Sequence, residues 1–413
     1  MGDVKFRAWF VRLAFFLAMA MLLVASGIAA SVNPPALTPH RKARGVTENQ
    51  HAKKRMRTLA RSRAPRSQYA THRRHRYYER FSTSSFASDI TEGDVTAGED
   101  PVVRQAAIDA LGNMNGTVVA IEPTSGRVLA MVNQKLALSG GAQPCSTIKL
   151  SVALAALSEG VIDEGTEVPL GRRSRMNLTE ALAHSNNAYF EAVGRKLGFE
   201  KVQYYAHQFG LGELAGYQIP GEQLGTYPEV EISSKLGGVG KMCSFGEGIS
   251  MTPLQLGALV TAISNGGTLY YLQHPNSSDG VASFQPRVKR HLDIEPVIPE
   301  LSDGMAGAVM YGTARSVHLN FNEESILGKT GTCSRAGTRY GWFASYANTD
   351  VGRIVTVVFL QGGHPTFGPK AAEIAGRMYR NLYDHKFFVA GADDTTPTPP
   401  DLEKVSTESA PQE

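Results

Sequence analysis

Residues 144–150, Pro-Cys-Ser-Thr-Ile-Lys-Leu, place two candidate nucleophiles, Cys145 and Ser146, shortly before a lysine, Lys149. Ser146 and Lys149 lie three residues apart, so they share one face if a helix begins at the serine. A serine hydroxyl becomes a good nucleophile when a base removes its proton, and lysine acts as that base only when neutral. An unperturbed lysine, with a pKa of about 10.4, is almost fully charged at pH 7. The segment therefore requires burial and a second cation nearby, which together lower the pKa of Lys149.

Cys145 competes with Ser146 for the role of nucleophile. It lies four residues before Lys149, so spacing alone does not exclude it. It stands at the entry to the predicted helix, where helical geometry does not fix its side-chain direction. A catalytic cysteine usually pairs with a histidine, and the local segment has none. Taken alone, the Ser-x-x-Lys spacing is a weak signal, because a surface serine and lysine produce it by chance.

Two further elements follow in order along the chain. Ser185 and Asn187, in Ser-Asn-Asn, bring a hydroxyl and an amide to a predicted helix–loop junction. Lys329 begins Lys-Thr-Gly-Thr after an apolar strand and supplies the missing cation, and Gly331 allows a substrate backbone to approach closely. The set S-x-x-K, S-x-N, K-T-G is associated with penicillin-binding proteins and serine β-lactamases.

The flanking sequence also resembles the transpeptidase domain of penicillin-binding proteins, over most of residues 100–365. The stretches that carry this resemblance are AIEPTSGRVLAMV (120–132), PCSTIKL (144–150), LTEALAHSNNAYFEAVGRKLGF (178–199), FGEGISMTPLQLGALVTAISNGG (245–267), GTARSV (312–317), ILGKTGTC (326–333) and GWFASYA (341–347). The resemblance implies a penicillin-binding protein or serine β-lactamase-like fold, in which a mainly antiparallel sheet is flanked by helices and an all-helical subregion is present.

The resemblance also implies roles for individual residues. Ser146 would be acylated by the D-Ala-D-Ala end of a peptidoglycan stem peptide, or by a β-lactam ring that mimics it. Lys149 would take the serine proton, Ser185 would relay a proton to the leaving group, and Asn187 would hydrogen-bond the substrate amide. Each assignment rests on the position of the residue in its motif.

The Lys-Thr-Gly-Thr element would bind the substrate. Lys329, with Thr330 and Thr332, would hold the terminal carboxylate and keep Lys149 neutral. The backbone N–H groups of Ser146 and Thr332 would form the oxyanion hole. No cofactor is implied, and no metal-binding spacing such as His-Glu-x-x-His occurs in the sequence.

The three cysteines, Cys145, Cys243 and Cys333, make neither a disulfide framework nor a Cys-x-x-Cys site. Many relatives in the family have glycine where Cys145 stands, and Cys333 follows Lys-Thr-Gly-Thr on a strand that the family packs beside the nucleophile helix. The resemblance therefore allows a Cys145–Cys333 disulfide beside the active site. The favoured interpretation is two buried free thiols.

The hydrophobic pattern predicts an α+β fold, with strands at both ends of the domain and helices between them. Strands at 116–121 and 127–133 flank a short turn that ends in glycine, which predicts a hairpin. Capping-box patterns begin at Asn177 and Thr252. The other predicted elements are a helix at 146–158, a helix running through His184 toward Leu197, strands at 326–333, 341–347 and 353–361, and a final helix at 369–384.

The net charge of +4 is unevenly distributed. Residues 41–80 carry 14 Lys or Arg and two acids, so the rest of the chain is mildly acidic. This Pro-, Ser- and Arg-rich region lacks apolar periodicity, which predicts a basic, mostly disordered linker over 33–99. The stretch HRRHRYYER (72–80) fits a tether on anionic envelope polymers or lipid headgroups better than a nucleic-acid-binding arm, so nucleic acid ranks last among the partners.

The N-terminus is typical of an exported protein. Lys5, Arg7 and Arg12 precede an apolar run, which predicts a signal peptide or membrane anchor over 1–32. We expect the transpeptidase domain, residues 100–390, to lie on the periplasmic side of the inner membrane. Residues 391–413 are predicted to be a disordered tail.

The preferred function is a membrane-associated D,D-transpeptidase that cross-links peptidoglycan stem peptides, with β-lactams as covalent inhibitors and other cell-wall synthesis proteins as further partners. The alternatives on the same scaffold are a D,D-carboxypeptidase and a β-lactamase. The absence of a Glu-x-x-x-Asn pattern after Ser-Asn-Asn argues against an efficient β-lactamase, which needs a dedicated base for deacylation. Outside catalysis, the alternative is a weakly catalytic scaffold that binds β-lactams or peptidoglycan.

Overall fold

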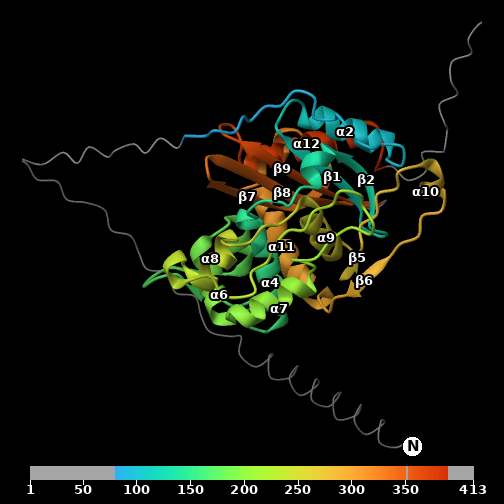
Figure 1. The fold of residues 1–413 in the computed structure, drawn as a ribbon. Coiled ribbons are helices and arrows are strands. Elements are labelled where there is room, and N and C mark those ends of the chain that lie inside the picture. The colour runs from blue at the N-terminus through green and yellow to red at the C-terminus, as the bar shows by residue number, and fades with distance from the viewer. Residues whose placement is uncertain (1–79, 350–351, 389–413) are drawn as a thin grey trace, which may run out of the picture. The chain divides into compact units, whose positions relative to one another are not determined.

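A five-stranded antiparallel sheet joins the two ends of the domain (Figure 1). The computed structural model describes residues 80–349 and 352–388. In spatial order the strands are β2 (Arg127–Val132), β1 (Gly116–Glu122), β9 (Gly352–Gly362), β8 (Thr338–Thr349) and β7 (Ser325–Arg335). Because β1 pairs with β9 across more than 200 residues of sequence, the predicted α+β fold is confirmed. The strand that carries Lys-Thr-Gly-Thr, β7, lies at one edge of the sheet.

Helices cover both faces of this sheet (Figure 1). α2 (Pro101–Leu111) and α12 (Gly368–Asp384) pack on one face, and α9 (Pro253–Ser264) packs on the other, where α11 (Ile298–Met310) contacts β7. Among the described residues, the other α-helices are α3 (Gln134–Ala137), α4 (Lys149–Ser158), α5 (Leu178–Ala183), α6 (Asn187–Leu197), α7 (Phe199–Gln208), α8 (Gly238–Phe245) and α10 (Ser278–Ala282). Two small antiparallel pairs are β3 (Val168–Pro169) with β4 (Arg175–Met176), and β5 (Thr268–Tyr270) with β6 (Val288–His291).

Alternation along the strands creates two hydrophobic cores. In β1, Val119 and Ile121 belong to the core shared with α4 and α9, whereas Val118 and Ala120 face the core built with α2 and α12. This follows from the two-residue period of a strand, in which successive side chains point to opposite faces. Both faces of β1 are buried, which explains why the run GTVVAI is apolar except for Thr117, whose hydroxyl donates to the Val132 carbonyl oxygen (2.6 Å).

Several local predictions are confirmed. The hairpin forms between β1 and β2. At the start of α9 the Thr252 hydroxyl accepts from the Gln255 N–H (3.1 Å) while the Gln255 side chain accepts from the Thr252 N–H (3.0 Å), a complete capping box. At the start of α5, Asn177 Oδ1 accepts from the Glu180 N–H (3.0 Å), but the Glu180 carboxylate accepts from the Tyr311 hydroxyl and not from Asn177, so only half of the predicted capping box forms. The final helix begins one residue before its predicted start.

Two predicted helices differ from the structure, and both differences lie at the candidate site. The predicted helix at 146–158 begins as a 3-10 turn, Cys145–Ile148, and becomes the α-helix α4 at Lys149. The predicted helix through His184 is two helices, because Ser185 adopts a left-handed backbone conformation (φ 55°) that ends α5 before α6 begins. A non-glycine residue in that region interrupts the helical hydrogen-bond ladder.

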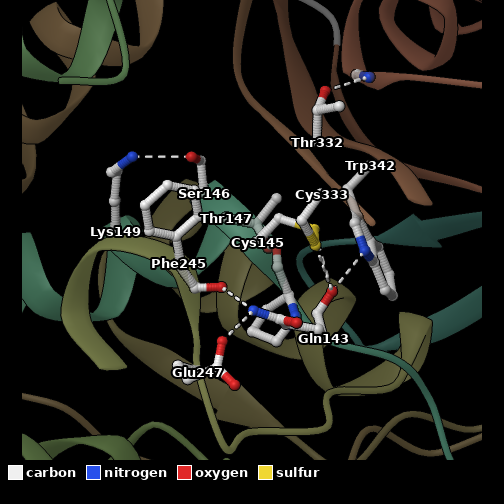
Figure 2. The surroundings of a disulfide bond; sticks show 12 residues. Gln143, Cys145, Ser146, Thr147, Lys149, Phe245, Glu247, Thr332, Cys333 and Trp342 are labelled. Carbon is white, nitrogen blue, oxygen red and sulfur yellow. Dashed lines mark hydrogen bonds between the residues drawn. A yellow bond between two sulfur atoms is a disulfide. The ribbon is translucent and has the colours of Figure 1, made fainter. Parts of the chain in front are cut away.

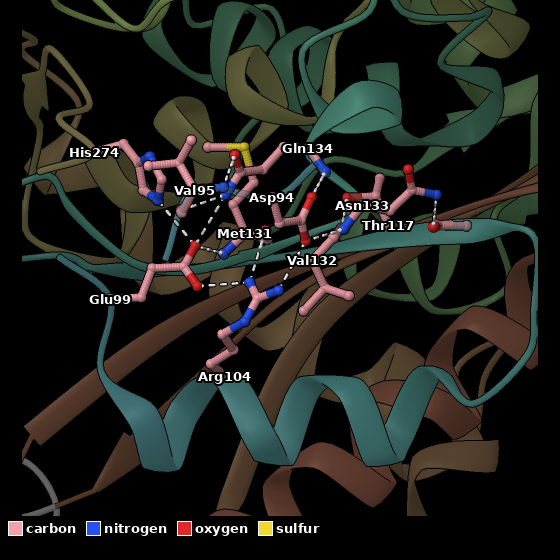
Figure 3. Close-up of polar contacts among 11 residues, drawn as sticks. Asp94, Val95, Glu99, Arg104, Thr117, Met131, Val132, Asn133, Gln134 and His274 are labelled. Atoms are coloured by element: carbon pink, nitrogen blue, oxygen red, sulfur yellow. Dashed lines mark hydrogen bonds and ion pairs between the residues drawn. The ribbon is translucent and has the colours of Figure 1, made fainter. Parts of the chain in front are cut away.

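Residues 80–99, inside the predicted linker, pack against the domain, and Figure 3 shows the contacts of Asp94, Val95 and Glu99 from this segment. Arg104 at the start of α2 pairs with Asp94 (2.9 Å) and Glu99 (2.7 Å), and both carboxylates are almost fully buried. Asp94 also accepts from the backbone N–H groups of Asn133 and Gln134. Buried charges therefore hold the segment before α2 against the domain, although its polar composition had predicted a disordered linker.

Three predicted segments lie outside the described residues: the apolar segment at 13–32, the linker before residue 80 and the tail from 391. Within the ranges that the structure describes, no helix combines the length and the apolar character needed to cross a membrane.

Candidate active site

The 3-10 turn brings Ser146 and Lys149 together. Its backbone bonds run from residue i to i−3: the Thr147 N–H donates to Pro144 O, and the Lys149 N–H to Ser146 O. With three residues per turn, side chains at i and i+3 eclipse each other. The Lys149 Nζ consequently lies 2.8 Å from the Ser146 Oγ. This distance suits proton transfer from the hydroxyl to a neutral amine.

The break between α5 and α6 supplies the next two groups. At Ser185, the left-handed residue, both the carbonyl oxygen and the hydroxyl turn toward Lys149, 3.0 and 3.2 Å from its Nζ. Asn186 caps α6 by accepting from the Tyr189 N–H (2.9 Å). Asn187, the first residue of α6, accepts from Lys149 through Oδ1 (2.6 Å), which leaves its Nδ2 group to donate elsewhere.

Lys329 of β7 completes the cluster from the sheet. Its Nζ donates to the Ser185 Oγ (2.8 Å) and to the Thr330 carbonyl oxygen (3.1 Å). The Ser185 hydroxyl therefore lies between two lysines that come from elements 180 residues apart. The structure brings together five of the predicted site residues: Ser146, Lys149, Ser185, Asn187 and Lys329.

Both lysines are fully buried, and this changes their charge state. Burial lowers the pKa of Lys149 well below its ordinary value, and the nearby charge of Lys329 lowers it further. Burial alone lowers the pKa of Lys329 to about 7. The sequence predicted that burial and a second cation together lower the pKa of Lys149. In the structure, desolvation is the larger cause and the cation is the second.

The hydroxyls of the two threonines in Lys-Thr-Gly-Thr form hydrogen bonds with groups outside the lysine cluster. Thr330 Oγ1 shares a hydrogen bond with Thr313 Oγ1 (2.7 Å), and Thr332 Oγ1 accepts from the Gly368 N–H (2.7 Å). This follows from strand alternation, which sends Lys329 to the opposite face of β7. At Gly331, an added Cβ would lie 2.9 Å from Pro144 O, so this glycine also lets the nucleophile turn approach β7 closely.

Two contacts at the site were not predicted from the sequence. The first is the hydrogen bond between Thr313 and Thr330. Thr313 lies in GTARSV, a stretch that resembles the family but to which the sequence assigned no role. The Gln143 carbonyl, just before the nucleophile turn, accepts from the Trp342 indole N–H of β8 (3.0 Å). Backbone carbonyls give no sequence signal, so this contact required the three-dimensional structure.

The prediction of two free thiols is wrong, because Cys145 and Cys333 form a disulfide with a Cα–Cα distance of 5.6 Å (Figure 2). The bond links the nucleophile turn to β7 across 188 residues of sequence. Cys145 has a left-handed backbone (φ 53°), which turns its side chain toward the strand. Cys243 remains a buried free thiol, and burial raises its pKa to about 12. The disulfide removes Cys145 as a rival nucleophile.

A surface cavity of about 740 Å³ is lined by residues from the end of α5 and from the segment that follows α11, and by none of the five clustered residues. It begins at His184, next to Ser185, and passes Thr313, the partner of Thr330. Arg315, an exposed cation, stands on its wall. The cavity is large enough for several residues of an extended peptide, and its wall carries positive charge that suits a carboxylate.

The family model for the penicillin binding protein transpeptidase domain matches residues 116–383. The chain belongs to this transpeptidase family. Its penicillin-binding protein relatives include Stage V sporulation protein D of Bacillus subtilis, 27% identical over 64% of this chain and 48% of that protein. A second is the peptidoglycan D,D-transpeptidase MrdA of Acinetobacter baumannii, 24% identical over 70% of this chain and 54% of that protein. The chain thus spans about half the length of these two relatives.

Solved structures show the same penicillin-binding protein fold. A peptidoglycan glycosyltransferase from Burkholderia ambifaria matches with a TM-score of 0.60 at 18% identity, over 70% of this chain and 98% of that one. Penicillin-binding protein 2 (PBP2) of Pseudomonas aeruginosa, in complex with WCK 5153, matches with a TM-score of 0.58 at 23% identity, over 70% and 77%. At these identities the likeness concerns the fold.

Proposed function

We propose that this protein is a serine D,D-transpeptidase that cross-links peptidoglycan stem peptides through an acyl-enzyme on Ser146. The observation that carries the proposal is the buried chain of contacts from Ser146 Oγ to Lys149 Nζ (2.8 Å), and through Ser185 Oγ to Lys329 Nζ (2.8 Å). The nucleophile and the proton carrier both lie within hydrogen-bond reach of a base with a lowered pKa, as covalent acyl transfer requires.

In acylation, neutral Lys149 takes the Ser146 proton while the Oγ attacks the carbonyl carbon of the penultimate D-alanine. The developing oxyanion accepts from the backbone N–H groups of Ser146 and Thr332. The bond to the terminal D-alanine then breaks, and Ser185 passes a proton to the departing amine. Ser185 is suited to this step, because its hydroxyl lies within 3.2 Å of both lysine Nζ atoms.

Substrate binding is proposed to use the remaining groups. Lys329 holds the terminal carboxylate, and the Asn187 Nδ2 group donates to the peptide. Thr330 and Thr332 join Lys329 when substrate binds, by turning their hydroxyls toward the carboxylate from Thr313 and the Gly368 N–H. The cavity that begins at His184 receives the rest of the stem peptide. An amine from a second stem peptide then attacks the ester and releases Ser146. The names of the relatives from Acinetobacter baumannii and Mycolicibacterium smegmatis, both peptidoglycan D,D-transpeptidases, support this choice of acceptor.

The proposal extends to the domain organisation. Residues 1–32 are a signal peptide or single-pass anchor, a basic linker follows, and the transpeptidase domain works on the periplasmic side of the inner membrane. The chemistry supports this location, because peptidoglycan stem peptides are cross-linked outside the cytoplasm. β-Lactams are proposed as covalent inhibitors, and other cell-wall synthesis proteins as partners.

The test is covalent labelling by a fluorescent penicillin. The full-length protein should become labelled, and Ser146→Ala should not, while a Cys243→Ala variant should label like the parent. Label that persists in Ser146→Ala contradicts the assignment of the nucleophile. Mass spectrometry of the active-site peptide locates the acyl group independently of the variants.

Product analysis separates transpeptidation from hydrolysis. A stem-peptide donor with a D-amino acid acceptor should yield the cross-linked or exchanged peptide and free D-alanine. Release of D-alanine without exchange would instead assign a D,D-carboxypeptidase. Rapid loss of the penicillin label would assign a β-lactamase, because the acyl-enzyme must then be hydrolysed by a dedicated base.

The pH dependence of acylation follows from the two lysines. We expect the second-order rate constant, which reports the free enzyme, to rise as Lys149 loses its proton. It should fall again above about pH 7, because the pKa of Lys329 is lowered to about 7 and the neutral amine no longer holds the carboxylate. The predicted profile is a bell, measured with fluorescent penicillin between pH 5 and pH 10.

A charge-retaining variant assigns the falling limb of this profile. Lys329→Arg keeps its cation at every pH used, because a guanidinium titrates above about pH 12. The rate constant of this variant should be lower overall but should not decline above pH 7. A falling limb that persists unchanged in Lys329→Arg would assign the decline to another group.

A further inference from the structure

The Cys145–Cys333 disulfide lies between the two halves of the proposed oxyanion hole (Figure 2). Cys145 directly precedes Ser146, and Cys333 directly follows Thr332. The backbone N–H groups of Ser146 and Thr332 are the two donors that the oxyanion requires. The residue just before the first donor, Cys145, is therefore covalently bonded to the residue just after the second donor, Cys333.

The backbone of Cys145 directs the first donor. The Ser146 N–H lies in the peptide plane that follows Cys145, so any rotation at Cys145 re-aims it. Cys145 has a φ of 53°, in the left-handed region, which costs a non-glycine residue about 1 kcal/mol or more. The disulfide fixes the Cβ of Cys145 against β7 and so holds this residue in a conformation that it rarely adopts.

Non-covalent contacts hold the same junction less firmly. The Trp342 indole donates to the Gln143 carbonyl oxygen (3.0 Å), which lies 3.3 Å from the Cys145 Sγ. Gly331 leaves room for Pro144 and Thr147 to pack directly on β7. These contacts resist separation of the turn from the strand, but neither prevents rotation at Cys145. The disulfide supplies that restraint.

We propose that this disulfide is a positioning element of the oxyanion hole, and that thiol redox state therefore controls the rate of acylation. The inference rests on the proposed function of Ser146. Oxidised protein holds the two N–H donors in register with the carbonyl of the bound substrate. Reduced protein keeps the nucleophile and its base, because Lys149 contacts Ser146, Ser185 and Asn187 without the cysteines.

A dithiol reduces this disulfide in two exchange steps, through a mixed disulfide with Cys333. A thiolate attacks the Sγ of Cys333, whose residue is partly exposed whereas Cys145 has no exposed surface. The S–S bond breaks, its electron pair passes to the Cys145 Sγ, and that sulfur takes a proton. The second thiol of the reductant then displaces Cys333 as a thiol. Two electrons move from the dithiol to the protein, which gains two thiols, and the reductant becomes a disulfide.

The experiment compares oxidised and reduced full-length protein. Dithiothreitol reduces the disulfide and is removed by anaerobic gel filtration, and thiol titration counts the gain of two thiols. Stopped-flow labelling with a fluorescent penicillin then separates the dissociation constant of the initial complex from the acylation rate constant. We expect the rate constant to fall about 10- to 100-fold on reduction, because small displacements of oxyanion donors cost this much. The dissociation constant should change less than about threefold, and reoxidation should restore the rate.

Variants separate positioning from general stability. Cys145→Ala/Cys333→Ala should acylate at the reduced rate in both states, and Cys243→Ala should respond to reduction as the parent does. A rate constant that is unchanged by verified reduction overturns the inference while Ser146-dependent label persists. A fall matched by unfolding at the assay temperature, measured by circular dichroism, also overturns it, because the bond is then only structural. Loss of Ser146-dependent label in every state contradicts the proposed function itself and the inference with it.

Discussion

Lys149→Met should lower the acylation rate constant by about 10²- to 10⁴-fold, the usual contribution of a positioned general base. Methionine nearly matches the lysine in volume and suits the buried site, but its thioether sulfur is far too weak a base to take the proton of the Ser146 hydroxyl, which lies 2.8 Å from the lysine amine in the parent. The dissociation constant for penicillin should change little, because Lys329 remains to attract the carboxylate. Stopped-flow labelling measures both constants.

A second variant tests the base role against a purely electrostatic one. Lys149→Arg keeps a cation at the site but cannot become neutral at working pH. It should lose as much of the acylation rate as Lys149→Met does. The matched control is Lys196→Met on α6, where an exposed lysine donates to the Val161 carbonyl oxygen, 2.9 Å away. If Lys149→Arg retains the parental rate, the lysine acts through its charge and another group is the base.

The sequence predicted those parts of the site that depend on local pattern. The Ser146–Lys149 spacing predicts a shared face, and an α-helix and a 3-10 turn both provide it. The capping box at Thr252 and the hairpin of β1 and β2 are each encoded within a few residues, and both form as predicted. Lys329 joins the cluster from a distant strand, and the family resemblance, with its three motifs in order, placed it there.

Features that depend on contacts between segments far apart in the sequence could not be predicted from local patterns. The left-handed turn at Ser185 is favoured because its hydroxyl and carbonyl bond to Lys149, and nothing in Ser-Asn-Asn alone requires it. The Cys145–Cys333 bond depends on how closely β7 approaches the nucleophile turn, which Gly331 permits. The pKa of Lys149 depends on burial more than on its spacing from any other charge.

Arg104→Met should lower the free energy of unfolding by about 3 to 5 kcal/mol at neutral pH. The Arg104 guanidinium is the cation shared by Asp94 and Glu99, whose side chains are only 2% and 1% exposed. Its removal leaves two buried carboxylates with hydrogen bonds from backbone N–H groups, Gln134 and His274 but without the guanidinium as counter-ion. Denaturant unfolding followed by circular dichroism measures the loss.

Two comparison variants establish that burial, rather than the loss of an arginine, causes this cost. Arg195→Met removes an arginine that is 57% exposed and pairs with Glu191 on α6, and it should cost less than about 1 kcal/mol. Neutralising the acids as well, in Asp94→Asn/Glu99→Gln/Arg104→Met, should recover much of the stability, because no uncompensated buried charge remains. Equal losses for Arg104→Met and the triple variant would instead assign the cost to lost packing of the guanidinium stem. The predicted recovery would mean that residues 94–99 are held to the domain by charge compensation, which explains why this polar stretch belongs to the fold.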